Sequence, residues 1–273
     1  MKLKTKTKQL DLSTKTHVMG ILNVTPDSFS DGGKYDDIAQ AVERAIQMEK
    51  EGADIIDVGG ESTRPDHKPI TAEEEMRRVL PIIEALRERL TVPISIDTYK
   101  AKTAKAALEA GADMINDIWG ATYDPEMANV AADYNVPIIL MHNHTSKEYN
   151  SIIDDMIADL ERSINLAKKS GVRDEQIVLD PGIGFGKHLR DNFVVMQHLE
   201  RLTSHFDYPF LLATSRKSFI NEIIPSEPEE RDNATGATTC LGITKGVQIV
   251  RVHDVKRTVE LTKMMDAMTK GLK

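Results

Sequence analysis

The sequence predicts a single-domain α/β fold, an eight-stranded β/α (TIM) barrel with a short N-terminal β-hairpin. Short runs rich in β-branched residues recur eight times, and each is followed by a stretch with helical periodicity. The first predicted strand begins at His17 and the eighth at Val247, which gives about 33 residues per unit, the size of a β/α repeat. A chain of 273 residues suits one such barrel. We therefore expect a hairpin over residues 1–16 and a catalytic barrel domain over residues 17–273.

The eight predicted strands are apolar and bounded by turn residues. In chain order they are 17–24, 53–59, 93–98, 113–118, 136–142, 176–180, 209–214 and 247–253. Strict alternation of apolar strands with helices indicates a parallel sheet covered by helices. An open doubly wound sheet is the alternative, but it would favour a glycine-rich fingerprint after the first strand, and residues 19–23 contain none. Eight units favour closure into a barrel.

The predicted helices have apolar stripes and recognisable ends. One stripe comprises Ile153, Met156, Ile157, Leu160, Ile164 and Ala167, and another comprises Leu261, Met264, Met265 and Met268. Thr71 with Glu74 and Asp124 with Pro125 are typical of helix starts. Gly52, Gly111 and Gly171 are typical of helix ends. Pro81 lies inside the helix predicted over 72–90, so we expect a kink there or two shorter helices.

Composition and charge exclude several classes of protein. Thirty-five Lys and Arg against 43 Asp and Glu give a net charge of −8 without a basic cluster, so we expect no nucleic-acid partner. The only cysteine, Cys240, cannot form an intrachain disulfide or a cysteine-based metal site, which suits a reducing compartment. The N-terminal residues 1–12 lack the apolar stretch of a signal peptide, and no apolar run reaches membrane-spanning length. We expect a cytoplasmic protein without a membrane partner.

Polar side chains stand at or just after the end of every predicted strand. They are Asn23, Glu61 with Arg64, Asp97, Asn116 with Asp117, His142 with Asn143, Asp180, Arg216 with Lys217, and Arg251 with His253. In a β/α barrel the carboxyl ends of the strands meet at one mouth, where active sites are built. One such residue often only caps a helix, and a structural ion-pair network is the alternative for the whole set. Polar residues at all eight strand ends favour a polar ligand at the mouth, because charges that are buried together there need partners.

The residue types indicate what the ligand contains. Asp97, Asp180 and Asn116 can pair with the amidine-like edge of a planar heterocycle. The Arg and Lys side chains suit a diphosphate and its Mg²⁺. Loops 27–33 and 59–65 are rich in Gly, Ser and Asp, which is typical of mobile lids. We therefore expect a site for a heterocycle and an anion.

Other catalytic motifs are absent from the sequence. Residues 180–187 (DPGIGFGK) are not a Walker A loop, because Pro181 stands where that motif has Gly and His188 stands where it has Ser or Thr. This segment instead predicts a loop that brings the backbone close to a ligand and presents Phe185 as an apolar wall. No transition-metal motif or nucleophile elbow occurs, and neither Ser62 nor Ser215 has an evident histidine and acid.

The sequence resembles the dihydropteroate synthase family of bacterial folate biosynthesis over nearly its whole length. The resemblance is carried by residues 19–33 (MGILNVTPDSFSDGG), 57–65 (DVGGESTRP), 94–98 (ISIDT), 115–118 (INDI), 179–185 (LDPGIGF), 214–218 (TSRKS) and 250–253 (VRVH). It implies a transferase that condenses 6-hydroxymethyl-7,8-dihydropterin diphosphate with 4-aminobenzoate to give 7,8-dihydropteroate and pyrophosphate. It further implies Mg²⁺ as cofactor, a homodimer, and a target of sulfonamides.

The resemblance also assigns roles to individual residues. The implied pterin-binding residues are Asp97, Asn116, Ile118, Met141, Asp180, Lys217 and Arg251, with Asp97, Lys217 and Arg251 catalytic. The implied diphosphate ligands are Arg64, Arg251 and His253, and Asn23 is the implied metal ligand. The 4-aminobenzoate site is implied to comprise Thr63, Pro65, Phe185, Lys217 and Ser218, and Asp31 is implied to belong to a lid. The chain departs from the family pattern at Asp66, where Gly is usual, and at Gly186, where Ala is common.

The absence of a nucleophile with its base predicts a dissociative substitution at the pterin methylene without a covalent enzyme intermediate. Two other functions remain open at this point. Barrels that bind methyltetrahydrofolate for transfer to a corrinoid are similar in the third, fourth and sixth strands, but they need no residues for a diphosphate. A non-catalytic pterin-binding regulator would have lost Lys217, Asp97 or the lid, and none is lost here.

Overall fold

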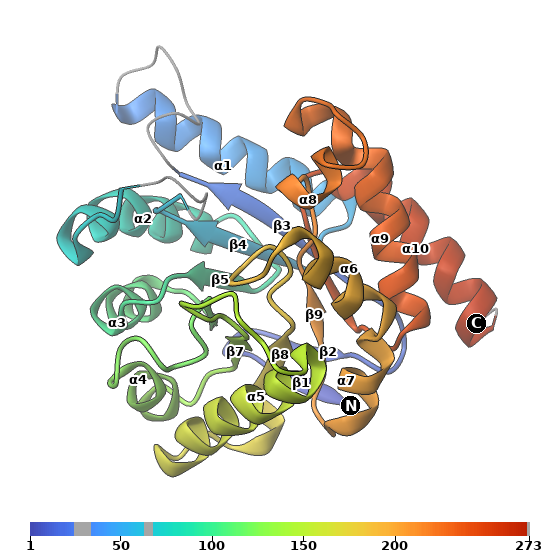
Figure 1. Ribbon diagram of the computed structural model, residues 1–273. Coiled ribbons are helices and arrows are strands. Elements are labelled where there is room, and N and C mark those ends of the chain that lie inside the picture. Colours follow the sequence, from blue (N-terminus) through green and yellow to red (C-terminus); the bar gives the residue numbers. More distant parts are fainter. Residues whose placement is uncertain (25–33, 63–67, 272–273) are drawn as a thin grey trace.

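A computed structural model describes residues 1–24, 34–62 and 68–271, and in it the eight predicted strands form one parallel sheet rolled into a nearly closed barrel (Figure 1). The strands are β3 (His17–Asn23), β4 (Ile55–Gly59), β5 (Ile94–Asp97), β6 (Met114–Asp117), β7 (Ile138–Met141), β8 (Ile177–Asp180), β9 (Leu211–Leu212) and β10 (Ile249–Val252). Their order in the sheet is β8-β7-β6-β5-β4-β3-β10-β9. An isolated parallel bridge between Leu179 and Phe210 joins the two edges. The predicted barrel is therefore confirmed.

Helices surround the sheet in Figure 1. They are α1 (Lys34–Glu51), α2 (Ala72–Arg87), α3 (Ala101–Ala110), α4 (Met127–Asp133), α5 (Ile152–Lys169), α6 (Leu189–Gln197), α7 (Leu199–His205), α8 (Ser218–Asn221), α9 (Asp232–Thr244) and α10 (Val255–Lys270). Short 3-10 turns at Asp174–Gln176 and Pro228–Arg231 precede β8 and α9. The main core lies between the helices and the sheet, because the strands are apolar on both faces.

The helix ends follow most of the sequence signals. The Thr71 side chain accepts a hydrogen bond from the Glu74 N–H at 3.2 Å, as a helix cap does. Gly111 ends α3 in the left-handed conformation at φ 118°. Pro81 lies within one continuous helix, α2, so of the two predicted alternatives the pair of shorter helices is wrong and the kink stays a prediction.

The predicted helix start at Asp124 and Pro125 is wrong. Helix α4 begins at Met127 with Glu126 before it, two residues later than expected. The Asp124 carboxylate instead accepts hydrogen bonds from the N–H groups of Ala101 and Glu126, at 2.8 and 3.1 Å. Asp124 therefore serves an unpaired N–H group at the start of α3 as well as its own turn.

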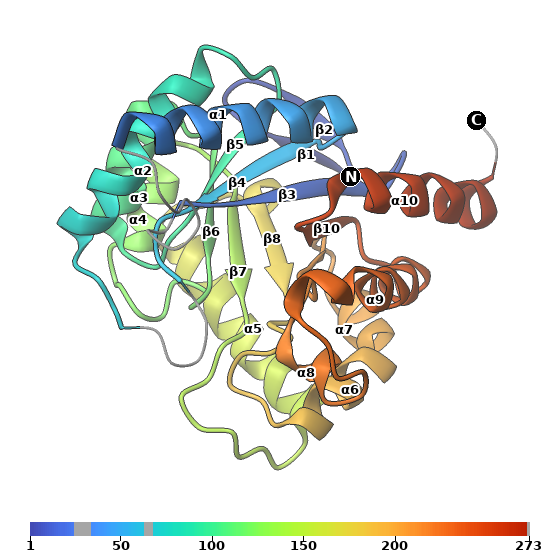
Figure 2. The same cartoon turned by 90° about the horizontal axis from the view of Figure 1, so that it is seen from above.

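The N-terminal hairpin closes the amino end of the barrel. Strands β1 (Lys2–Lys4) and β2 (Gln9–Asp11) pair antiparallel. Figure 2 shows the hairpin and the N-terminus on the side away from the arrowhead of β3. The hairpin shares an apolar cluster with the interior of the barrel, made of Leu3, Leu10, Leu12, Met19, Ile55, Met114, Ile139, Val178, Leu211, Ala213 and Ile249. A separate unit ending at residue 16 stays a prediction.

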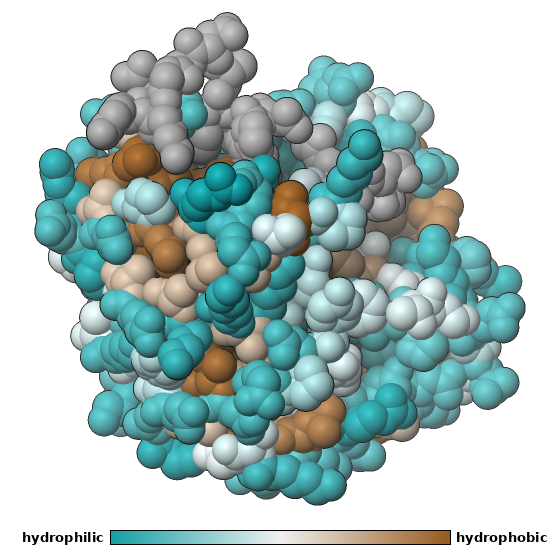
Figure 3. Space-filling view, turned by 90° about the vertical axis from the view of Figure 1, so that its left-hand side faces the viewer, coloured by the Kyte–Doolittle hydropathy of each residue, from teal (hydrophilic) through white to brown (hydrophobic). Residues whose placement is uncertain are grey.

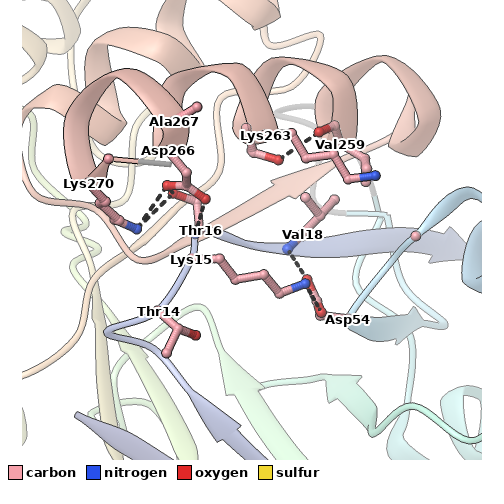
Figure 4. A pocket seen from close by; sticks show the side chains of 13 residues that line it. Thr14, Lys15, Thr16, Val18, Asp54, Val259, Lys263, Asp266, Ala267 and Lys270 are labelled. Atoms are coloured by element: carbon pink, nitrogen blue, oxygen red, sulfur yellow. Dashed lines mark hydrogen bonds and ion pairs between the residues drawn. The ribbon is translucent and has the colours of Figure 1, made fainter. Parts of the chain in front are cut away.

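A cavity of about 540 Å³ lies at the amino end, between the start of β3 and the last turns of α10 (Figure 4). The carboxylate of Asp266 accepts hydrogen bonds from the backbone N–H and the hydroxyl of Thr16, at 2.6 and 2.8 Å, and it contacts Lys270 at 2.9 Å. Lys15 pairs with Asp54 across the same cavity at 2.6 Å. The Thr16 hydrogen bonds hold α10 to the start of β3, and the Lys15–Asp54 ion pair holds the segment before β4 there, which is a structural role.

Within residues 1–24, 34–62 and 68–271, no helix is both long and apolar enough to cross a membrane.

Candidate active site

The carboxyl ends of the strands bring most of the predicted site residues to one end of the barrel. Asn23, Asp97, Asn116, Met141, Asp180 and Arg251 lie in the last two residues of β3, β5, β6, β7, β8 and β10. Ile118, Phe185, Lys217, Ser218 and His253 follow β6, β8, β9, β9 and β10. Thr63, Arg64, Pro65, Asp31 and Asp66 lie outside the described residues.

Arg251 lies between two carboxylates at the centre of this end. Its Nε donates to Oδ2 of Asp57 and its Nη2 to Oδ2 of Asp97, each at 2.6 Å. Nδ2 of Asn116 donates to the same oxygen of Asp57 at 3.0 Å. Four strands, β4, β5, β6 and β10, thus supply one hydrogen-bonded network that holds three of the predicted pterin residues.

The sequence analysis did not predict Asp57 as a site residue. Asp57 is completely buried and occupies the middle of β4, whose other residues are apolar or glycine. The signal that could have found it was a carboxylate inside an otherwise apolar strand, because such a charge needs a partner. Asp57 lies in mid-strand, so it is not among the residues at strand ends.

Burial shifts the pKa of several groups at the mouth. It raises the pKa of Asp97 to about 7, although Arg251 opposes the shift. It raises the pKa of Asp180 and lowers the pKa of Lys217 to about 8, against the effect of the Asp180 charge. Burial also opposes the charge of Arg251, but Asp57 and Asp97 outweigh it and raise the pKa of Arg251. Shifted carboxylate and amine pKa values at one mouth are typical of functional sites.

The glycine-rich loop after β8 packs tightly against neighbouring segments. Oδ1 of Asp180 accepts a hydrogen bond from the Gly182 N–H at 2.7 Å. Gly182 has φ +64°, and a Cβ there would stand 1.9 Å from the carbonyl oxygen of His142. A Cβ at Gly184 would stand 3.0 Å from the Lys217 side chain. Glycine is therefore needed for close packing against His142 and Lys217. The approach of this backbone to a ligand stays a prediction.

Lys217 bridges this loop to the segment after β9. Its Nζ donates to the carbonyl oxygen of Ile183 and lies 4.6 Å from the centre of the Phe185 ring. The ammonium over the ring is a cation–π contact. The structure thus brings together Lys217 and Phe185, two of the three described residues for which the resemblance implies contact with the same substrate.

An apolar wall stands beside the charged network. Ile118 and Met141 form a buried cluster with Tyr99, and Trp119 and Phe185 pack against it. Figure 3 views the side toward which the arrowheads of β3, β4 and β5 point in Figure 1, and on it hydrophobic residues lie next to strongly hydrophilic ones. A flat, partly apolar and partly polar molecule matches such a wall.

His253 is held by a serine. The Ser215 hydroxyl lies 2.9 Å from Nδ1 of His253 and accepts a hydrogen bond from the backbone N–H of the same residue at 3.2 Å. The sequence had shown no histidine partner for Ser215, because the two residues are 38 positions apart. The contact joins the segment after β9 to the end of β10 and orients the imidazole.

Three further polar residues at or after strand ends, Asp117, Arg216 and Glu61, have partners outside the Arg251 network. The Asp117 carboxylate accepts the N–H groups of Trp119 and Ala121, so it caps a turn, and burial raises its pKa to about 7. Arg216 pairs with Asp232 of α9 at 2.7 Å. The Glu61 carboxylate accepts a hydrogen bond from the Tyr99 hydroxyl at 2.9 Å.

Asn23 is the described candidate for a metal ligand. A Cβ at Gly59 would stand 3.5 Å from Cβ of Asp97 and 3.7 Å from Oδ1 of Asn23, so the two side chains flank the same glycine. Among the described residues, no group of three or more His, Cys, Asp or Glu could hold a metal ion.

Comparison with known proteins assigns the family. A family model described as pterin binding enzyme matches residues 19–253. Dihydropteroate synthase from Bacillus subtilis is 56% identical over 264 residues, 97% of this chain and 92% of that protein. Dihydropteroate synthase from Clostridium beijerinckii is 52% identical over 98% of this chain and 100% of that protein.

Solved structures agree with these relatives. A crystal structure of dihydropteroate synthase from Clostridium difficile in the presence of pteroic acid has a TM-score of 0.93 at 48% identity, covering 95% of this chain and 99% of that one. Dihydropteroate synthase from Xanthomonas albilineans in complex with 7,8-dihydropteroate has a TM-score of 0.91 at 36% identity, covering 100% of both chains. The chain belongs to the dihydropteroate synthase family of pterin-binding enzymes.

Proposed function

We propose that this protein condenses 6-hydroxymethyl-7,8-dihydropterin diphosphate with 4-aminobenzoate to give 7,8-dihydropteroate and pyrophosphate. The observation that carries the proposal is the convergence of Asp97, Asn116 and Arg251 on one hydrogen-bonded network at the mouth of the barrel. Family membership supports the same activity. The enzyme is a transferase of folate biosynthesis.

The pterin ring has a planar face and an edge that donates and accepts hydrogen bonds. Asp180 and Asn116 are suited to that edge, because carboxylate and amide groups pair with an amidine. The guanidinium of Arg251 is suited to stack on the face. Ile118 and Met141 supply the apolar wall that would contact the ring.

The diphosphate needs positive charge and donors. Arg251 and His253 stand two positions apart, in and just after β10, and are suited to bind it. Arg64 stays a prediction for the same role. The amide oxygen of Asn23 fits Mg²⁺, which prefers oxygen ligands and keeps several waters. When bound, Mg²⁺ would neutralise charge on the departing pyrophosphate.

The 4-aminobenzoate site would lie between the loop after β8 and the segment after β9. The Phe185 ring and the Lys217 ammonium already contact each other there, and Ser218 follows at an exposed position. An aromatic wall and a cation suit a substrate that joins a benzene ring to a carboxylate. Thr63 and Pro65, like Asp31 of the lid, stay predictions from the sequence.

The reaction is a substitution at the exocyclic methylene of the pterin. The carbon–oxygen bond breaks first, its electron pair leaves with pyrophosphate, and the dihydropterin ring delocalises the cation. The Asp97 carboxylate, together with Asp180, favours that cation electrostatically. The amine nitrogen then forms the new carbon–nitrogen bond and loses a proton. This dissociative course needs no covalent enzyme intermediate, and a pterin trapped on the protein during turnover would contradict it.

The experiment is pyrophosphate release from the pterin diphosphate with Mg²⁺, in the presence and absence of 4-aminobenzoate. We expect release that depends on 4-aminobenzoate, yields 7,8-dihydropteroate and collapses in Asp97→Asn. Pterin binding without release would instead favour a methyl-transfer barrel or a regulatory pterin-binding protein. In that case Asp66→Gly is the first variant to make.

We also propose a homodimer and a cytoplasmic location. Met264 and Met268 on α10 are each 60% exposed, and Met265 lies between them on the same helix, so this stripe is only partly covered within one chain. A monomer mass in sedimentation at micromolar concentration would contradict the dimer. The cytoplasmic location rests on the sequence alone.

A further inference from the structure

Lys187 is a buried lysine beside the proposed site that the reaction does not use. Lys187 is the last residue of the glycine-rich loop after β8, and it is only 4% exposed. The ammonium nitrogen lies 3.0 Å from the carbonyl oxygen of Gly182, 3.1 Å from that of Phe185 and 2.9 Å from Nδ1 of His142. It therefore meets three groups that can accept hydrogen bonds, and two of them belong to its own loop.

The state of His142 decides what Lys187 must supply. Nε2 of His142 lies 3.3 Å from Oδ2 of Asp159, on α5, a contact within ion-pair distance whose angles do not make a hydrogen bond. A carboxylate only accepts, so the histidine proton belongs on Nε2 and the lone pair on Nδ1. Burial lowers the pKa of His142 to about 4, so the imidazole is neutral at neutral pH. Nδ1 therefore accepts a hydrogen bond from Lys187.

Three acceptors require three N–H donors, and only the ammonium form of lysine has three. A neutral amine would donate twice and direct its lone pair at the third acceptor. The histidine cannot remedy this by moving its proton to Nδ1, because its bare Nε2 would then face Asp159. The geometry thus matches one protonation state of the trio: an ammonium on Lys187, a neutral His142 with its proton on Nε2, and a carboxylate on Asp159.

Several other groups act on this trio. The charges that favour the ammonium come from Asp180, Asp191 and Asp159, and the opposing charge is that of Lys217. The charge of His144 contributes to lowering the pKa of His142. The Tyr149 hydroxyl donates to the carbonyl oxygen of Gly186 at 2.6 Å. Burial lowers the pKa of Lys187 to about 7. The ammonium form is therefore lost as the pH rises through neutrality.

We propose that Lys187 is a positioning residue, whose ammonium, directed by the His142–Asp159 pair, holds loop 182–187 in the shape that places Phe185 against Lys217. The loop also has other ties. The N–H groups of Gly182, Gly184 and Phe185 donate to Asp180, Asn192 and Gly182 at 2.7, 2.6 and 3.1 Å, and the carbonyl oxygens of Ile183 and Gly186 accept from Lys217 and Tyr149. Lys187 adds two hydrogen bonds within the loop and one to His142. The consequence for catalysis rests on the proposed synthase function, whereas the order of the loop does not.

The test is amide hydrogen exchange of the ligand-free protein at pH 6 and pH 8.5, corrected for the intrinsic pH dependence of exchange. We call the three hydrogen bonds of the Lys187 ammonium the clamp. We expect the protection of the Gly184 and Phe185 amides to be at least about tenfold higher at pH 6, because local opening costs less at pH 8.5, where the clamp is lost. The internal control is the Val247 amide, which donates to the Gly242 carbonyl oxygen at 3.1 Å in a turn of backbone bonds. Its protection should not change.

Two variants separate the clamp from general packing. Lys187→Met keeps the length of the side chain without its donors, and we expect low loop protection at both pH values. Asp159→Asn lets Nε2 of His142 accept, so the histidine can donate from Nδ1 to a neutral lysine and protection at pH 8.5 should exceed that of the wild type. This variant carries the test if Lys187→Met does not fold. Glu161→Gln is the matched control, since Glu161 lies on the same helix and contacts His205 at 3.2 Å.

Kinetics then connect the loop to catalysis. For Lys187→Met we expect the KM for 4-aminobenzoate to rise about tenfold with a smaller change in kcat, because the Phe185 wall is misplaced. Loop protection in Lys187→Met and Asp159→Asn that equals that of Glu161→Gln at both pH values would overturn the inference and leave the synthase function untouched. A protein that lacks synthase activity but loses loop protection in Lys187→Met would overturn the proposed function and retain the clamp.

Discussion

Asp57 and Asp113 are both completely buried, but Asp57 lies within β4 and contacts side chains at the carboxyl ends of the strands, whereas Asp113 precedes β6 at the amino end. Asp113, at the amino end, accepts hydrogen bonds from the N–H groups of Thr7 and Ile94 at 3.0 and 2.8 Å and pairs with Arg87 at 2.9 Å. Both of its oxygens are used, and two of its partners are backbone groups. It therefore fastens the N-terminal hairpin and α2 to the start of β5.

Asp57, toward the carboxyl end, holds other side chains. Its Oδ2 accepts from both Arg251 and Asn116, and Oδ1 has no hydrogen-bond partner among the described residues. A buried oxygen without a partner is costly, and natural proteins retain such groups chiefly where function needs them. The comparison indicates that buried charge stabilises the fold at the amino end and prepares a binding site at the carboxyl end.

Replacement of Asp57 should produce the largest effect on activity. Asp57→Asn keeps one oxygen to which Arg251 and Asn116 can donate, but it removes the negative charge that pairs with the Arg251 guanidinium. We expect kcat/KM to fall by about 10²–10³, the range for loss of one preorganised electrostatic group, with little change in the thermal unfolding midpoint. Steady-state kinetics beside a thermal melt measure both quantities. A loss of activity below tenfold would contradict the role given to Asp57.

Asp113→Asn should reverse that outcome. It weakens an ion pair and two charge-assisted hydrogen bonds, so we expect the free energy of unfolding to fall by about 2 kcal/mol while kcat stays within about twofold of the wild type. Urea unfolding monitored by circular dichroism gives the first number. A variant as stable as the wild type but inactive would contradict the stabilising role given to Asp113.

The same division explains what the sequence could predict. Each observed strand lies within its predicted range because apolar runs and turn residues are local signals. Strand ends such as Asp97 and Arg251 could be placed in the site because barrel topology brings the ends together. The roles of two residues could not be predicted from the sequence, for a physical reason. Asp124 caps α3 across 23 positions, and Asp57 contacts Arg251 across 194; such distant pairings leave no periodic trace in a single sequence.

The pH dependence of activity should sharpen the comparison. Burial raises the pKa of Asp97 to about 7 and lowers that of Lys217 to about 8. Activity that needs the carboxylate and the ammonium should rise as Asp97 loses its proton near pH 7 and fall, up to about tenfold per pH unit, as Lys217 loses its proton above about pH 8. A pH profile of kcat at saturating 4-aminobenzoate measures this bell, because the effect expected of Lys187 lies mainly in the KM for 4-aminobenzoate.

Lys217→Arg provides the control for the alkaline limb. The guanidinium stays charged throughout that range, so the residual activity of the variant should no longer fall above pH 8. An unchanged alkaline limb would assign that limb to another group.

The smallest effect is expected for an exposed pair at the amino end. Lys15 contacts Asp54 at 2.6 Å, but half of the lysine side chain is exposed, so Lys15→Met should cost less than about 1 kcal/mol of unfolding free energy and no activity. Hydrogen bonds from His17 and Lys15 outweigh burial and lower the pKa of Asp54. The stability that Asp54 contributes is therefore present above its unfolded pKa of 3.8 and is lost as the pH falls through the lower folded value.

Unfolding of Lys15→Met in low and high salt distinguishes this contact from a buried one. Salt screens an exposed pair, so the difference from the wild type should vanish at about 1 M salt, whereas the loss caused by Asp113→Asn should persist. A salt-independent difference for Lys15→Met would mean that the cavity between β3 and α10 shields its charges as the mouth of the barrel does. The contrast between the two ends would then depend on the partners of each charge rather than on its exposure.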